Sequence, residues 1–286
     1  MAYFVATVVI GALLAPILFW SAQSLAAHGV FSFLTKYDFE TFFHRALLVA
    51  AVLLLWPLLR SCQVRSAADL GLASNSRWGR DVFAGVVISV VPLLCCGAFL
   101  IAFHVYSFRH SFAWPRVGKM ILASITVPLI EEVFFRGIVL GVLLRTGRKY
   151  VAMFAVSMIF AAVHFLKAPE RTSTVVTWTS GFSSIAHAFD GIRDSMMLAA
   201  ALATLFIIGW ILADARMRTR SLWLAIGLHA GWIFGSGIFS LGARQRIPAL
   251  PWVGKNLLVG IIPLGVAALT WVIMGIWMKY DRASHV

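Results

Sequence analysis

Residues 120–144, MILASITVPLIEEVFFRGIVLGVLL, decide how the chain folds. The stretch is long enough to cross a bilayer, which takes about 20 apolar residues. Its middle nevertheless holds Glu131, Glu132 and Arg136. Each ionisable side chain at the centre of a spanning helix costs roughly 2.5–3.5 kcal/mol. Together they predict a membrane helix that carries a functional site. The alternative is an ion cluster that only holds helices together.

The composition of the whole chain is that of a polytopic membrane protein. Of its 286 residues, 61% are hydrophobic and only 12% are charged, with a mean hydropathy of +0.90. This balance excludes a soluble domain. The net charge of +13 could indicate nucleic-acid binding, but the basic residues lie in short clusters between apolar runs. Clusters of this kind are typical of topology signals and contacts with anionic lipid, so we expect membrane lipid and no nucleic acid as partners.

Eight apolar runs are candidates for membrane crossing. They cover about residues 3–28, 43–59, 83–107, 118–144, 150–166, 195–213, 221–241 and 256–278. They predict an all-α polytopic integral membrane protein with about eight transmembrane helices. No repeat or long hydrophilic block divides the chain, so we expect residues 1–286 to form a single membrane domain. Cys62, Cys95 and Cys96 follow no pairing or metal-ligand spacing, and the neighbours Cys95 and Cys96, inside an apolar run, are expected to be reduced packing residues.

Short basic loops predict the orientation. Eight spans place both termini on the side that holds the loops RTGRK (145–149) and ARMRTR (215–220). Short loops rich in Lys and Arg stay in the cytoplasm, so we expect both termini there. Without an organelle signal, the simplest location is a bacterial inner membrane. The link 167–194 mixes Ser, Thr, Trp and Phe with few charges, which suits either an interfacial or re-entrant piece or an ordinary loop.

Local geometry divides the two glutamates. Glu132 and Arg136 are four residues apart, so they share a helix face and can pair. Glu131 is turned away from Glu132 by about 100°. One carboxylate is therefore expected to be neutralised by Arg136, while the other faces a different space.

Two histidines fall near the glutamates in depth. His164 and Glu132 each lie about 20 Å from the helix ends that the short RTGRK loop joins. Helices joined so closely are antiparallel neighbours, so Glu131, Glu132 and His164 are expected to converge. His229 lies about 12 Å in, nearer to Arg136. A carboxylate, an imidazole and a water form a general-base unit, and a second histidine and an arginine can stabilise an oxyanion.

Three short motifs carry a family resemblance. EEVFFRG (131–137) resembles the Glu-Glu-x-x-x-Arg motif of the CAAX protease and bacteriocin-processing family, the glutamic-type intramembrane endopeptidases. FAAVH (160–164) is similar to its Phe-x-x-x-His motif, and HAGWI (229–233) lies where its His-x-x-x-Asn motif is expected. The matching core runs from about residue 118 to 241.

The resemblance implies a polytopic helical fold that uses no metal or other cofactor. It implies that Glu131 and His164 activate the attacking water, while Glu132 and Arg136 support and polarise the site. His229 would stabilise the oxyanion. The expected substrate is a membrane-associated protein or peptide whose peptide bond is hydrolysed.

The third motif departs from the family pattern. Ile233 stands where the family has Asn, and its side chain cannot donate a hydrogen bond. Ser236, on the same helical face, or the indole of Trp232 could bind the substrate oxygen instead. The glycines of this helix, Gly227, Gly231, Gly235 and Gly237, predict a small-residue face that lets a neighbouring helix approach.

Other functions remain compatible with the same residues. A metal-dependent membrane protease could use the glutamates and histidines as ligands, although the sequence contains no His-Glu-x-x-His. An immunity or scaffold protein of the same fold would bind a partner without cleaving it, as the missing Asn suggests. A proton- or cation-coupled transporter would show internal symmetry, and we find none. The substrate, the cleavage position, the side of substrate entry and the oligomeric state stay open.

Overall fold

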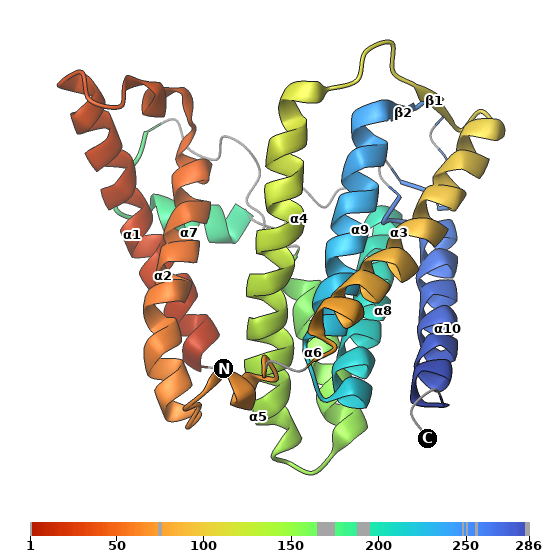
Figure 1. Ribbon diagram of the computed structural model, residues 1–286. Coiled ribbons are helices and arrows are strands. Elements are labelled where there is room, and N and C mark those ends of the chain that lie inside the picture. The colour runs from red at the N-terminus through yellow and green to blue at the C-terminus, as the bar shows by residue number, and fades with distance from the viewer. Residues whose placement is uncertain are drawn as a thin grey trace. The chain divides into compact units, whose positions relative to one another are not determined.

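Helices make up 79% of the residues that the computed structural model describes. The structure describes residues 2–73, 76–164, 175–187, 195–247, 249, 251–254 and 257–283. The helices are α1 (Ala2–Ala27), α2 (Phe39–Ser61), α3 (Trp78–Ala102), α4 (Val117–Glu132), α5 (Leu140–Leu144), α6 (Lys149–Val163), α7 (Ser180–Ala186), α8 (Ser195–Thr219), α9 (Trp223–Gly242) and α10 (Ile261–Ala283) (Figure 1). Short 3-10 helices lie at η1 (Ser32–Lys36), η2 (Ala67–Leu70) and η3 (Trp114–Arg116), and η4 (Val133–Val139) is a π-helix. The predicted all-α class is confirmed.

Six helices in the described part of the chain are long and apolar enough to cross a membrane: α1, α2, α3, α8, α9 and α10. The predicted span 118–144 falls on α4, η4 and α5, which follow one another without a break. The predicted span 150–166 falls on α6, which is shorter, with 15 residues. The chain is therefore an integral membrane protein. Cys62, Cys95 and Cys96 form no disulfide.

One predicted span is longer than the helix that the structure contains. The run 83–107 was expected to be helical throughout, but α3 ends at Ala102. His104 adopts a positive φ of 59°, a left-handed conformation that stops the helix. Residues Tyr106–Phe108 then form strand β1, which pairs antiparallel with β2 (Ala243–Gln245) beyond the end of α9.

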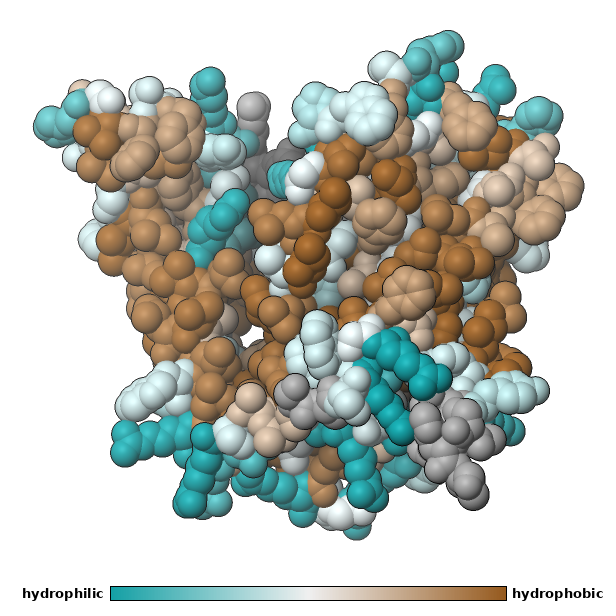
Figure 2. All heavy atoms as spheres, viewed as in Figure 1, coloured by the Kyte–Doolittle hydropathy of each residue, from teal (hydrophilic) through white to brown (hydrophobic). Residues whose placement is uncertain are grey.

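Hydrophobic side chains cover much of the surface. Large apolar residues are exposed along the spanning helices, for example Leu53 and Trp56 of α2 and Phe83 of α3. In Figure 2 such side chains cover the middle of the visible helices, and hydrophilic ones gather toward their ends. An apolar belt of this kind suits contact with lipid rather than water.

The described residues group into two compact units. The first contains Met1–Arg65 and Ala162–Arg193, and its core includes Ala12, Phe39 and Phe43. Within this unit α7 rests directly on α1, because a Cβ on Gly181 would collide with the backbone of Ala12. Ala12 lies near the middle of α1, so the described part of the link 167–194 reaches membrane depth. This contact favours the re-entrant piece over the ordinary loop.

The second unit, Ser66–Ala161 and Asp194–Val286, is organised around α3 and α9. A Cβ on Gly231 would collide with Ser89 Oγ, and one on Gly227 with Val82 O, both on α3. From the opposite side, a Cβ on Gly85 would come within 2.6 Å of Leu228 N. The predicted small-residue face is confirmed. This backbone contact fixes the position of α9 and therefore of His229.

The β1–β2 pair is anchored by Tyr106. Its hydroxyl donates a hydrogen bond to Gly254 O at 2.7 Å. Burial, with a smaller contribution from the nearby Cys96 thiol, raises the pKa of Tyr106 to about 12. The hydroxyl therefore keeps the proton that it donates.

The α3–α9 contact can be tested with Gly231→Ala. The added Cβ meets Ser89 Oγ, so we expect the free energy of unfolding to fall by about 1–3 kcal/mol. Thermal unfolding of the purified protein in detergent measures the loss. Gly265→Ala is the matched control, because a Cβ there meets nothing within 4 Å. Equal losses in the two variants would contradict the packing role.

Candidate active site

The Glu-Glu-x-x-x-Arg motif lies where the helix changes type. The α-helix α4 ends at Glu132, and the π-helix η4 begins at the next residue and carries Arg136. Pro128, one turn earlier, has no N–H for a helical hydrogen bond. Single π-turns inside α-helices occur frequently at functional sites. No pattern in the sequence predicted this change.

The two glutamates lie in different surroundings, as their angular separation predicted. The side chain of Glu132 is fully buried, whereas that of Glu131 is 26% exposed. The Glu132 carboxylate is thus enclosed by protein, whereas the Glu131 side chain is partly accessible to a substrate or to water.

Glu132 and Arg136 form the predicted ion pair. Arg136 Nη1 lies 2.8 Å from Glu132 Oε1, and both side chains are fully buried. Arg136 Nη2 donates to the backbone carbonyl of Gly209 on α8 at 3.1 Å. The guanidinium also lies over the ring of Phe160 on α6, 4.4 Å from its centroid. A buried arginine therefore has three partners from three helices, which offset part of the cost of its desolvation.

His229 brings α9 to the same carboxylate. Its Nδ1 lies 2.8 Å from Glu132 Oε1, so this oxygen accepts hydrogen bonds from both Arg136 and His229. An ionised carboxylate can only accept, so Nδ1 carries the proton. Its Nε2 lies 3.9 Å from Glu131 Oε2, which is too far for a direct hydrogen bond. A single oxygen atom could lie within hydrogen-bond distance of both atoms.

The Glu132–Arg136 pair has two buried polar atoms without a hydrogen-bond partner within the described residues. They are Glu132 Oε2 and Arg136 Nε. Buried polar atoms of this kind normally have a partner, often ordered water. Glu132 Oε2 can therefore accept a hydrogen bond from a water molecule, and Arg136 Nε can donate one.

Phe160 and Gly209 complete the site. The Phe160 ring packs edge-on against His229, with ring centroids 5.9 Å apart, as well as over Arg136. A Cβ on Gly209 would lie 3.1 Å from Ser157 Cα on α6, so this glycine lets α8 approach closely. The Phe-x-x-x-His spacing could have indicated Phe160. Nothing in the sequence marked the Gly209 carbonyl.

Three further residues were predicted for the site: His164, Trp232 and Ser236. His164 is exposed, directly follows α6 and groups with the first unit, so the structure does not describe its position relative to Glu131. Trp232 is buried. The Ser236 hydroxyl donates to Ile233 O at 3.3 Å, one turn earlier on α9. Ser236 is thus already bonded to its own helix at the position where the family Asn is replaced.

The order of the motifs and the buried Glu132–Arg136–His229 cluster agree with a comparison of the chain with known families. Residues 112–235 match the family described as Type II CAAX prenyl endopeptidase Rce1-like. The resemblance inferred from the motifs is confirmed, and the Rce1-like segment contains all three of them. This family implies a membrane endopeptidase, a hydrolase that acts on peptide bonds. Comparisons with curated proteins and with solved structures found no match.

The Glu132–Arg136 pair can be tested with a double-mutant cycle. Glu132→Gln or Arg136→Gln alone leaves a buried charge without its opposite partner, so we expect each to cost about 3–5 kcal/mol of unfolding free energy. The double variant should cost less than the sum by about 1–3 kcal/mol. Unfolding in mixed micelles gives the three values.

The Asp214–Arg218 pair is the matched control for this cycle. It has the same spacing and the same 2.8 Å separation, but the Arg218 side chain is 43% exposed. Its coupling energy should stay below about 1 kcal/mol, because the Arg218 side chain keeps contact with solvent. Equal coupling in the two pairs would show that burial does not strengthen the Glu132–Arg136 interaction.

Proposed function

We propose that the protein is a glutamic-type intramembrane endopeptidase that hydrolyses a peptide bond of a membrane-associated protein or peptide. The observation that carries the proposal is the placement of His229 between two carboxylates, one buried and paired with Arg136 and one partly open. The Rce1-like match over the same residues supports it. The catalytic core is residues 118–241 of a single membrane domain.

In the proposed reaction, Glu131 acts as the general base. It takes a proton from a water whose oxygen attacks the carbonyl carbon of the peptide bond. The tetrahedral intermediate then collapses, the C–N bond breaks, and Glu131 returns the proton to the leaving amine. Its partial exposure suits this role, because the water and the peptide must reach it.

His229 stabilises the oxyanion in this proposal. With Nδ1–H donated to Glu132, a doubly protonated ring directs its Nε2–H to the space beside Glu131. Arg136 holds Glu132, and Glu132 holds the ring, so the donor is oriented before the substrate arrives. Preoriented donors in a site of low dielectric lower the barrier most effectively.

His164 is proposed to assist Glu131 in activating the water. The motif resemblance assigns this role, and His164 follows Phe160, which contacts the site, by one helical turn. Ser236 and Trp232 are the proposed donors to the substrate in place of the absent Asn. For Ser236, this role requires its hydroxyl to leave Ile233 O.

The proposed topology has eight membrane crossings. The six long apolar helices are joined by α4–η4–α5 and by α6. An even number of crossings would put both termini on one side, and the basic loops 145–149 and 215–220 support a cytoplasmic location for that side. The proposed membrane is the bacterial inner membrane.

Glu131→Gln tests the chemistry. Removing the general base should lower cleavage about 10²- to 10⁴-fold while the protein still folds. Cells that carry the wild-type or the variant chain are compared by mass spectrometry of membrane-protein termini, which identifies the products. Asp38→Asn is the control, because it removes an exposed carboxylate at the start of α2, where Asn serves equally well as the N-cap residue. Identical termini in all cells would favour the non-proteolytic immunity or scaffold role.

Chelation separates this chemistry from a metal-dependent protease that uses the same side chains. Within the described residues, no three His, Cys, Asp or Glu side chains are grouped to hold a metal ion. Once a cleaved substrate is known, dialysis against a chelator should leave its cleavage rate within about twofold of the untreated rate. A rate that falls and returns on adding zinc would overturn the glutamic mechanism.

A further inference from the structure

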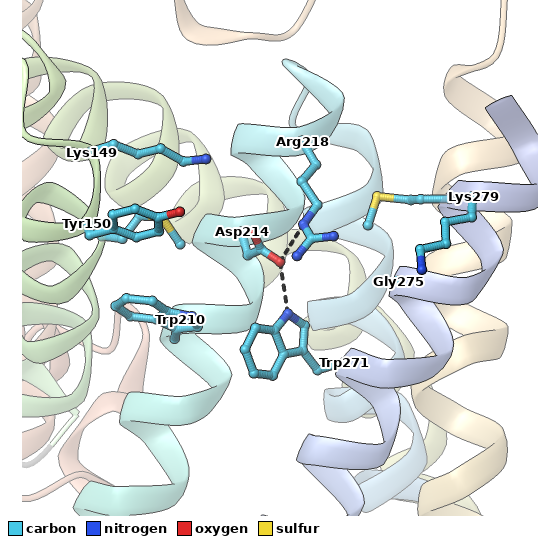
Figure 3. A pocket seen from close by; sticks show the side chains of 10 residues that line it. Lys149, Tyr150, Trp210, Asp214, Arg218, Trp271, Gly275 and Lys279 are labelled. Carbon is cyan, nitrogen blue, oxygen red and sulfur yellow. Dashed lines mark hydrogen bonds and ion pairs between the residues drawn. The ribbon is translucent and has the colours of Figure 1, made fainter.

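A second polar site lies in the unit that also contains Glu131 and Glu132, at a distance from these glutamates. It is a cavity of about 500 Å³ between α6, α8 and α10. Its lining is basic and aromatic in character, and Figure 3 shows the side chains. The residues used below are Lys149, Tyr150, Asp214, Arg218, Trp271 and Lys279. The basic end of the cavity, at Arg218, lies nine residues beyond Gly209 on α8, or about 13 Å along the helix, while its other end reaches Trp210, next to Gly209.

The centre of the cavity is fixed by a buried carboxylate. Asp214 Oδ2 accepts a hydrogen bond from the Trp271 indole on α10 at 2.8 Å. The same oxygen lies 2.8 Å from Arg218 Nε. Asp214 therefore joins α8 to α10 and orients Arg218, whose side chain stays 43% exposed despite this ion pair.

The cavity carries an excess of positive charge. Lys149, Arg218 and Lys279 contribute three positive charges, and Asp214 contributes one negative charge. In Figure 3, Lys149 and Lys279 lie on opposite sides of Arg218. Lys149 and Lys279 are exposed, and Lys149 also lies near the face of the Tyr150 ring, 5.5 Å from its centroid. This arrangement can surround an anion from three helices.

The cavity lies at helix ends, where lipid headgroups are found. Lys149 is the first residue of α6, Arg218 is next to the last residue of α8, and Lys279 lies in the final turns of α10. Tyrosine and tryptophan prefer this interfacial depth, and basic pockets between transmembrane helices bind anionic headgroups. The apolar helices that lead away from the cavity can pack against acyl chains.

We propose that this cavity binds the headgroup of an anionic phospholipid. The phosphate would lie between Lys149, Arg218 and Lys279, and the acyl chains would extend along α8 and α10. The proposal does not depend on the proposed endopeptidase activity.

Binding of short-chain lipids to the purified full chain in uncharged detergent tests the site. Short-chain phosphatidylglycerol should bind saturably and raise the Tm by several degrees, since a ligand that binds the folded state stabilises it. Phosphatidylcholine of the same chain length and inorganic phosphate at the same ionic strength should each raise it by less than half as much. An equal rise with phosphatidylcholine would overturn the requirement for a negative charge. An equal rise with phosphate would overturn the lipid assignment.

Two charge-matched double variants locate the site. Lys149→Gln/Lys279→Gln should weaken phosphatidylglycerol binding by about 10- to 30-fold, because each interfacial basic residue adds about 1 kcal/mol to the attraction. Arg148→Gln/Arg220→Gln removes the same charge from exposed residues of the loops beside α6 and α8 that do not line the cavity. Its effect should be less than about threefold. Equal weakening in both variants would overturn the proposal in favour of diffuse surface charge.

Discussion

The structure depends on one oxygen atom, Glu132 Oε1, that accepts hydrogen bonds from Arg136 and His229 inside a bundle of apolar helices. A buried charge without a partner would be too costly in this environment. The helices must therefore approach closely enough to bring its partners to it. Gly209 lets α8 approach α6, and Gly227 and Gly231 let α9 approach α3. The small residues that allow this packing thus also allow the ion cluster.

The same cluster gives two adjacent glutamates different surroundings. Glu132 is fully buried and already has two partners on one oxygen, so its charge is committed to holding Arg136 and His229. Glu131 is partly exposed and faces the other nitrogen of the His229 ring. A single imidazole therefore lies between a fully buried carboxylate and a partly exposed one. Neighbouring positions on one helix suffice because successive side chains point in different directions.

Most of the fold was predictable, and the site was predictable in part. Apolar runs predicted the spanning helices because a bilayer demands a length that the sequence displays directly. The Glu132–Arg136 pair followed from their spacing. Depth alone placed His229 only near Arg136, whereas the structure bonds it to Glu132, because side-chain reach across helices depends on their packing. The end of α3 and the π-turn at η4 were missed, since both depend on backbone conformations that residue type does not reveal.

Burial explains why two pairs with the same spacing serve different purposes. Glu132–Arg136 and Asp214–Arg218 are both acid–arginine pairs four residues apart, and each has a separation of 2.8 Å. In the first pair both side chains are enclosed, so the arginine is occupied by Glu132, Gly209 and Phe160. In the second pair the arginine lies at the helix end and stays largely exposed, so its charge can act on a ligand. The depth of the pair in the bundle therefore decides whether the cation organises a protein site or attracts an anion from outside.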